Sequence, residues 1–148
     1  MLSNIIIRDK ALRLAMKKTD FTSGSLNPLS LVAAQAAYEN GGEWLEQCQA
    51  YLRENLKILR SFLRERLPKI RLIEPEGTYF AWLDCSELGL SDTALENLIA
   101  HQAKLWLDGG SVFDKKSGQF ERIVLACTKK TLLQALTQLE AACRGRNS

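Results

Sequence analysis

One stretch, residues 43–67, constrains the fold more than any other part of the chain. Its apolar residues recur every three or four positions, and charged residues occupy the opposite side. This spacing predicts a single long helix with one apolar stripe, ended by Pro68. The stripe consists of Leu45, Cys48, Leu52, Leu56, Leu59, Leu63 and Leu67. Such a helix is stable only against another layer of secondary structure, so we expect a layered domain.

Short β-prone runs follow this helix and can form the second layer. Residues 70–73 and 78–84 flank a turn at Pro75-Glu76-Gly77, which predicts two antiparallel strands. Residues 105–107 and 121–127 predict two more strands. Both faces of the 78–84 run are apolar, so this strand is predicted to lie centrally and to be covered on both sides.

Further helices are predicted between and after these strands. Ser91 is a suitable N-cap for a helix that reaches about Gln102, and Thr128 for a helix that continues to Cys143. The stretch 108–120 has the composition of a loop and is long enough to suggest a functional role or local mobility. Residues 42–148 are therefore predicted to form an α+β domain, a small antiparallel or mixed sheet flanked by helices.

The first forty residues fit this domain poorly. Residues 2–7 are typical of a buried strand, and a short helix is predicted from Asp9 to just before Thr19. Asn27-Pro28 begins a helix to Tyr38 that is apolar almost all round and is predicted to be buried on several sides. We interpret residues 1–41 as the end of another domain, and residues 42–148 as a domain of their own.

Composition excludes several classes of function. The net charge of +3 is spread along the chain, and the basic pairs carry no interleaved aromatic residues, so nucleic acid is not expected as a partner. No apolar run approaches the roughly 20 residues that span a membrane. The four cysteines are isolated and the single histidine is His101, so no metal site is predicted. Isolated cysteines suit reduced, buried thiols in a cytoplasmic protein.

Arg122 is the polar residue with the greatest functional promise. It shares a predicted strand face with Val124 and Ala126, so its guanidinium lies over an apolar surface and needs an anionic partner. That partner is either an acidic side chain within the protein, in a structural ion pair, or the carboxylate of a ligand. The nearby Gly109-Gly110-Ser111 segment could bring backbone amides towards an anion, or it could simply form a turn.

Several segments, in order, resemble the class I/II pyridoxal-phosphate aminotransferases, and most of all their cystathionine β-lyase (C–S lyase) branch. The resemblance covers nearly the whole chain. Its most specific parts are Asn27-Pro28 with the helix to Tyr38, Gly42-Glu43-Trp44-Leu45, Pro75-Glu76-Gly77-Thr78-Tyr79, Trp82-Leu83-Asp84, Gly110 with Phe113, and residues 120–127. Three departures are Asp114 in place of a glycine, Val124 where the family usually has asparagine, and Thr128 in place of a proline.

The resemblance implies the C-terminal small domain of a pyridoxal-phosphate transferase at residues 42–148. Residues 1–41 would then be a remnant of the large cofactor domain with an interdomain helix. It also implies that Arg122 binds the α-carboxylate of an amino acid substrate such as cystathionine, which the complete enzyme cleaves by β-elimination. The family's Schiff-base lysine and its other cofactor-binding groups lie upstream of the matched segments. No catalytic or cofactor-binding residue is therefore expected within this chain.

From this resemblance we expect the chain to be a truncated domain, inactive by itself and binding no pyridoxal phosphate alone. Its expected partners are an amino acid substrate in the complete enzyme, and a second copy or a large-domain chain. The alternative hypothesis is a non-enzymatic binding or interaction domain that reuses the aminotransferase small-domain fold. A gene fragment, a split gene product and an engineered piece are all compatible with these residues.

Overall fold

The computed structural model describes residues 5–19 and 27–145. It divides into two compact units, residues 1–48 and 49–148, so the boundary falls within helix α3 (Gly42–Arg66). Each unit is described by itself. Within the described residues, no helix combines the length and the apolar character needed to cross a lipid bilayer. The domain boundary between residues 41 and 42 stays a prediction.

The first unit contains helices α1 (Lys10–Lys18) and α2 (Pro28–Asn40) and the first turns of α3. Both predicted helix starts are confirmed. The Asp9 side chain accepts a hydrogen bond from the Leu12 amide at 2.8 Å, and the Asn27 side chain accepts one from the Leu29 amide at 2.9 Å. Each of these caps satisfies an amide that the first turn of a helix leaves without an intrahelical acceptor.

Two predictions for this unit are wrong. Residues 5–7 do not form a strand, and Leu2, the start of the predicted strand, lies outside the described residues. Helix α2 was predicted to be buried on several sides but has no buried residue, and Leu29, Val32 and Tyr38 are all exposed. A strand and an all-round apolar helix both need neighbouring layers, and the described residues of this unit supply none.

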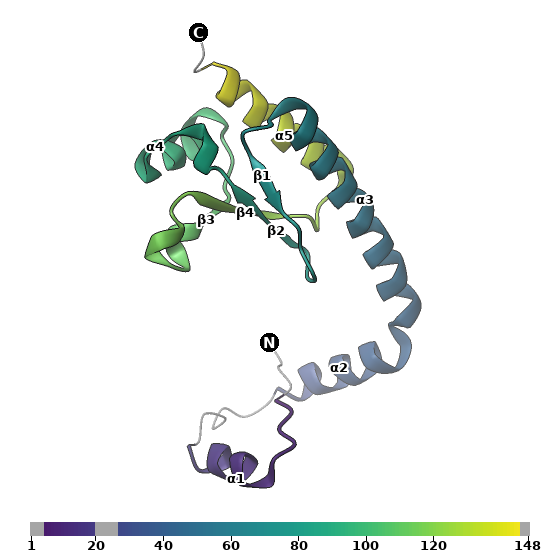
Figure 1. Cartoon of the computed structure of the whole chain (residues 1–148). Coiled ribbons are helices and arrows are strands. Elements are labelled where there is room, and N and C mark those ends of the chain that lie inside the picture. The colour runs from purple at the N-terminus through teal and green to yellow at the C-terminus, as the bar shows by residue number, and fades with distance from the viewer. Residues whose placement is uncertain (1–4, 20–26, 146–148) are drawn as a thin grey trace. The chain divides into compact units, whose positions relative to one another are not determined.

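The second unit is built on a four-stranded antiparallel sheet in the order β1-β2-β4-β3 (Figure 1). Its strands are β1 (Arg71–Ile73), β2 (Phe80–Asp84), β3 (Asp108–Gly109) and β4 (Phe120–Val124). The helical elements are the rest of α3, α4 (Asp92–Asn97) with a π-helical segment (Leu98–Gln102), and α5 (Lys129–Arg144). Three short 3₁₀ turns lie at Ser86–Leu88, Gly110–Val112 and Lys115–Ser117. The predicted α+β class is confirmed.

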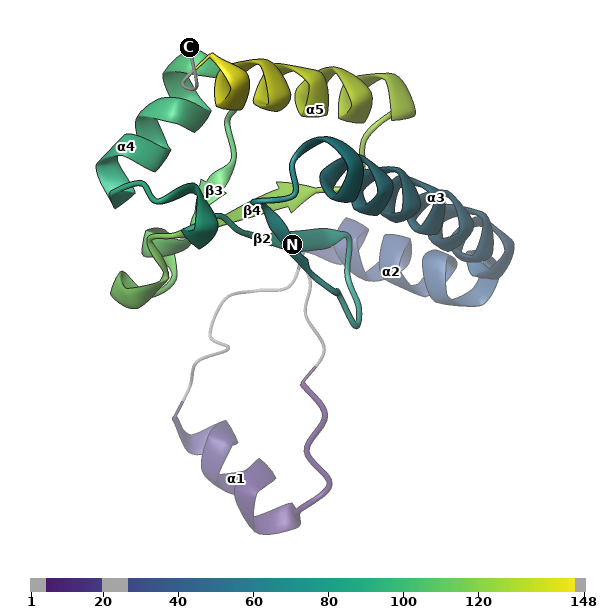
Figure 2. The same ribbon diagram turned by 45° about the horizontal axis from the view of Figure 1, so that its top comes forward.

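The core lies between the helices and one face of the sheet. Helices α3 and α5 lie side by side (Figure 2), and an ion pair between Arg66 and Glu140 at 3.0 Å joins them. The apolar stripe of α3 is buried in its second half, and α5 contributes a matching row. The main buried side chains are Leu59, Leu63, Leu67, Ala81, Leu83, Leu95, Leu98, Ile123, Leu125, Leu132, Leu136 and Leu139. Burying each large apolar side chain stabilises the fold by about 1.5–3 kcal/mol.

The opposite face of the sheet is not covered in the same way, which corrects the prediction for strand 78–84. Strand β2 is central, as predicted, but only Ala81 and Leu83 are buried under the helices. Phe80 and Trp82 point to the other face and are only partly buried. The described residues of the second unit thus form two layers, and the second apolar face of β2 is left open within this unit.

Two other strand boundaries differ from the predicted ones. Residues 105–107 form no strand, and pairing with β4 begins only at Asp108. Strand β4 ends at Val124, although the Leu125 amide still donates to the Tyr79 carbonyl at 2.8 Å. The chain then turns into α5, whose N-cap at Thr128 is confirmed, as is the N-cap of α4 at Ser91.

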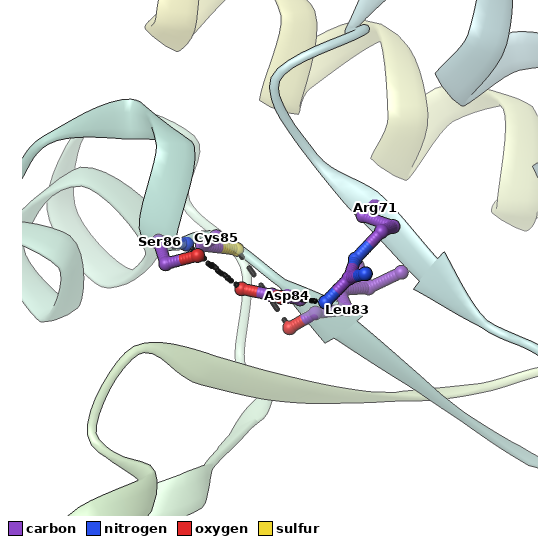
Figure 3. A network of polar contacts seen from close by, with 5 residues as sticks. All are labelled: Arg71, Leu83, Asp84, Cys85 and Ser86. Atoms are coloured by element: carbon purple, nitrogen blue, oxygen red, sulfur yellow. Dashed lines mark hydrogen bonds and ion pairs between the residues drawn. The ribbon is translucent and has the colours of Figure 1, made fainter.

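A polar network ties the ends of β1 and β2 together (Figure 3). Asp84 accepts hydrogen bonds from the Ser86 hydroxyl at 2.6 Å, the Ser86 amide at 3.0 Å and the Arg71 guanidinium at 2.7 Å. The Ser86 hydroxyl in the first place, and Arg71 to a smaller extent, lower the pKa of Asp84. Beside it, burial raises the pKa of the Cys85 thiol to about 12, so this cysteine is not a reactive thiolate.

A buried asparagine that sequence reasoning missed joins α3 to the end of β4. Asn55 is fully buried, and its amide nitrogen donates to the carbonyls of Leu125 and Cys127, both at 2.9 Å. These carbonyls belong to the segment that leads from β4 into α5. The Leu125 carbonyl also accepts from the Cys127 amide at 2.9 Å, so Asn55 is one of its two donors. Among the described residues Asn55 is the one donor to the Cys127 carbonyl, and an unsatisfied buried group is costly.

We predict that Asn55→Ala lowers the free energy of unfolding by about 2–4 kcal/mol, because the Cys127 carbonyl loses its donor, the Leu125 carbonyl loses one of two, and a cavity remains. Urea unfolding of the second unit, followed by far-ultraviolet circular dichroism, measures this change. The matched control is Glu54→Ala, the neighbouring exposed residue on α3, for which we expect a change within about 0.5 kcal/mol. Equal effects of the two substitutions would contradict the role given to Asn55.

Candidate functional site

Arg122 lies on the open face of the sheet, as predicted from the alternation along its strand. In the register of the sheet it stands between Trp82 of β2 and Asp108 of β3. Its side chain is only partly exposed, at 24%. Val124 lies on the same face and is exposed, while Glu121 and Ile123 point the other way and are buried. The strand therefore presents one cation on an otherwise largely apolar surface.

Asp108 holds one edge of the guanidinium. Arg122 Nη2 donates to Asp108 Oδ2 at 2.8 Å, and Arg122 Nε donates to the same oxygen at 3.2 Å. Arg122 Nη1 donates no hydrogen bond to any residue that the structure describes. The edge formed by Nη1 and Nη2 is therefore available for the two-oxygen contact that a guanidinium makes with a carboxylate.

Aromatic rings fix the position of this cation. The guanidinium carbon lies 4.1 Å from the centre of the Phe80 ring and 4.6 Å from that of Phe113. Trp82 in turn packs edge-on against Phe113 and Phe120, with ring centres 5.4 and 6.4 Å apart. Such contacts attract the cation and restrict its rotamers, so the Arg122 side chain is held in place before any ligand arrives.

A cavity of about 420 Å³ opens beside Arg122. Its other walls are the turn between β1 and β2, residues 73–78, and the rings of Phe80, Trp82 and Phe113. Thr78 in this turn has a φ of +66°, a conformation that is uncommon for a β-branched residue. Its hydroxyl accepts a hydrogen bond from the Phe80 amide at 3.2 Å, which helps to hold the turn in place. Backbone strain of this kind is typical of functional sites.

Both interpretations of Arg122 therefore retain support in the structure. The internal ion pair exists, with Asp108, but it lies at the surface, since 44% of the Asp108 side chain is exposed. Only one edge of the guanidinium, the one formed by Nε and Nη2, donates hydrogen bonds to Asp108. The pair holds Arg122 in place without filling the edge that a ligand carboxylate would take.

The neighbouring glycines form a turn rather than an anion cradle at this site. Gly109 pairs with Glu121 in the sheet, and Gly110 begins a 3₁₀ turn. Gly110 is required there, because a Cβ on it would come within 2.0 Å of the Ser117 carbonyl oxygen. The loop contributes to the Arg122 cavity through Phe113 instead. Among the described residues, no group of three His, Cys, Asp or Glu side chains could hold a metal ion.

Comparison with known proteins identifies relatives with this architecture. No family model matches the chain. Cystathionine β-lyase PatB of Bacillus subtilis is 32% identical over 147 residues, which cover 95% of this chain and 37% of PatB. Cystalysin of Treponema denticola, whose crystal structure contains pyridoxal 5′-phosphate, superposes with a TM-score of 0.87 at 30% identity, over 95% of this chain and 36% of that one.

A pyridoxal-phosphate-bound C–S lyase from Staphylococcus hominis superposes with a TM-score of 0.81 at 31% identity, over 93% of this chain and 36% of the lyase. This chain thus spans little more than a third of the length of each of these relatives. The segments predicted to resemble the C–S lyases are therefore matched by similarity in both sequence and fold.

We predict that Arg122→Ala lowers the free energy of unfolding by only about 1 kcal/mol, because the substitution removes a surface ion pair and contacts with two partly exposed rings. Thermal and urea unfolding of both proteins measure the difference. A double-mutant cycle with Asp108→Ala isolates the ion pair, which we expect to contribute less than about 1 kcal/mol. A loss of 3 kcal/mol or more would identify Arg122 as a structural ion-pair residue.

Proposed function

Since the chain corresponds to the C-terminal part of a fold-type I pyridoxal-phosphate enzyme of the C–S lyase branch, we propose that it supplies the substrate-carboxylate site of such an enzyme. In this proposal Arg122 binds the α-carboxylate of an amino acid whose Cβ–S bond the complete enzyme cleaves. Because PatB is a cystathionine β-lyase by name, we propose cystathionine as the substrate class.

The observation that carries the proposal is the free edge of the Arg122 guanidinium. Arg122 lines a cavity whose other walls are aromatic rings and a backbone turn. A carboxylate that enters this cavity can accept two parallel hydrogen bonds, while Asp108 keeps its single oxygen on the other edge.

Pyridoxal phosphate is the cofactor of the complete enzymes of this group. The described residues do not suffice to hold it at this site, because none of the residues that line the Arg122 cavity is a lysine. We therefore propose that these 148 residues do not catalyse the reaction by themselves. Their own contribution is to bind and orient the substrate carboxylate.

The remaining groups of the site must then come from another protein surface. We propose that the chain acts with a large cofactor domain or with a further copy of the enzyme, and that exposed apolar side chains of α2 such as Leu29 and Val32 suit such contacts. Cys48, Cys85 and Cys127 form no disulfide bond, which supports a reducing, cytoplasmic environment.

We predict that the chain binds L-cystathionine weakly, with a Kd of about 1 mM or above, because one partly solvated arginine supplies most of the interaction. Nuclear magnetic resonance titration should shift the signals of Arg122, Phe113 and Thr78. Arg122→Ala should abolish these shifts, and the surface control Arg64→Ala should leave them unchanged. Shifts that survive in Arg122→Ala would contradict the assignment.

We further predict β-lyase activity for a chimera in which this chain replaces the corresponding C-terminal part of PatB. Arg122→Ala should lower kcat/KM of the chimera by roughly 30-fold or more, because the substrate carboxylate loses a charged hydrogen-bonding partner. Pyruvate release from cystathionine measures the rate, with Arg64→Ala as the control. A folded, cofactor-loaded chimera that turns over equally well without Arg122 would refute its role. An inactive chimera that binds cofactor would favour a non-enzymatic domain.

A further inference from the structure

A second and larger cavity lies on the other face of β4. Its volume is about 690 Å³, within the range of about 300–1,000 Å³ that is usual for small-molecule sites. Its walls come from α4, the π-helical segment, the chain from Lys104 to Leu107, and the turn after β3. Glu121 reaches this cavity from β4, whereas its neighbour Arg122 reaches the smaller one. The two cavities are therefore separate sites.

The wall of this larger cavity is apolar over much of its area. The apolar side chains that line it are Ile99, Leu105, Trp106, Leu107 and Val112. Trp106 is 98% exposed, which is unusual for a tryptophan and leaves its whole indole ring free for contact. A ligand that fits these walls has an apolar, preferably aromatic, body.

The carboxylate of Glu121 favours a ligand that carries a charged group. It is 95% buried, since only 5% of its surface is exposed. Within the residues that the structure describes, its carboxylate accepts no hydrogen bond and forms no ion pair. Its Oε1 lies beside Gly109, which also lines the cavity. Neither of its oxygens is among the fully buried atoms that lack a partner, so the carboxylate opens onto the cavity. A ligand that enters the cavity with a donor group can therefore bind this carboxylate, which the protein itself leaves without a donor.

The charges around Glu121 favour a cation as that donor. Burial in the first place, and then the nearby carboxylates of Glu96 and Asp108, together raise the pKa of Glu121 to about 7. Asp92 and Glu96 of α4 also line the cavity. The wall also carries two basic residues, His101 of the π-helical segment and Lys104 just after that segment.

We propose that this cavity binds an organic cation with an aromatic or apolar body, whose ammonium or amidinium group donates hydrogen bonds to Glu121 while its body packs against Trp106 and Leu107. The charge of the ligand offsets the repulsion among Glu121, Glu96 and Asp108. Benzamidine is a suitable probe, because it joins an amidinium to one aromatic ring. Benzamide, of similar shape but neutral, is its matched control ligand.

The test is a titration of the 148-residue chain with benzamidine, followed by the nuclear magnetic resonance signals of the Trp106 indole and the Gly109 amide. Glu121→Gln should weaken binding at least tenfold, and Glu87→Gln, an exposed change outside the cavity, should not alter it. Benzamide should bind at least tenfold more weakly than benzamidine. Arg122→Ala should leave benzamidine binding intact, which separates this site from the proposed carboxylate site.

The pH dependence gives a second readout. Benzamidine binding should strengthen between pH 6 and pH 8, as Glu121 loses its proton, and this slope should vanish in Glu121→Gln. The slope should persist in His101→Gln, which removes the histidine from the wall of the cavity. Glu121→Gln is also expected to fold, because a pKa raised from 4.5 to about 7 means that Glu121 opposes folding increasingly as the pH rises from 4.5 to 7. Its denaturation midpoint should therefore exceed that of the wild type at pH 8, and the difference should shrink towards zero at about pH 4.

Three results would overturn the proposal: no binding of benzamidine, equal binding of benzamidine and benzamide, or unchanged binding by Glu121→Gln. Shifts confined to Phe113 and Thr78 would place the probe in the Arg122 cavity and would also contradict it.

Discussion

Burial of leucine side chains from α3 and α5 against one face of the sheet is the interaction on which the rest of this structure depends. It decides which side of each strand is inside. Because side chains alternate along a strand, placing Ile123 in the core puts Arg122 on the opposite face. A shift of one residue in the register of β4 would bury the arginine and expose the isoleucine. The position of the candidate site thus follows from where the core forms.

The same alternation gives β4 two chemical roles at adjacent residues. Glu121 and Arg122 carry opposite charges and point to opposite faces of one strand, and each faces a cavity of its own. Asp108 acts on both, since it pairs directly with Arg122 and raises the pKa of Glu121. A carboxylate ligand on the free edge of Arg122 would add negative charge near this group. The two sites are therefore coupled electrostatically, although the sheet separates them.

Much of this fold can be predicted from the sequence, because its helices and its hairpin are specified by local patterns. The stripe of α3, the caps at Asp9, Asn27, Ser91 and Thr128, and the turn between β1 and β2 all depend on residues close together in the chain. The errors concern long-range partners. The strand predicted at 105–107 lies instead at Asp108–Gly109, and α2 has no covering layer among the described residues.

The functional residues divide in the same way. Arg122 could be found by its place in an apolar strand and by family resemblance. Its hydrogen bonds to Asp108 could not be predicted, because they depend on the pairing between β3 and β4. Asn55 and Glu121 carried no sequence signal at all. A polar residue on the stripe side of a helix, or a glutamate before an arginine, is ordinary until the fold buries it.

The geometry around Arg122 further explains why such a residue needs a partner surface. Asp108, Phe80 and Phe113 fix the guanidinium, so little entropy is lost when a carboxylate binds. Preorganisation of this kind lowers the cost of binding but does not supply its strength, which depends on exclusion of water from both charges. With one wall open, solvent screens the pair. A second surface that closes over the cavity would strengthen the same two hydrogen bonds without any change in Arg122. If Arg122 has the role proposed for it, a site divided between two domains would bind its substrate tightly only when both are present.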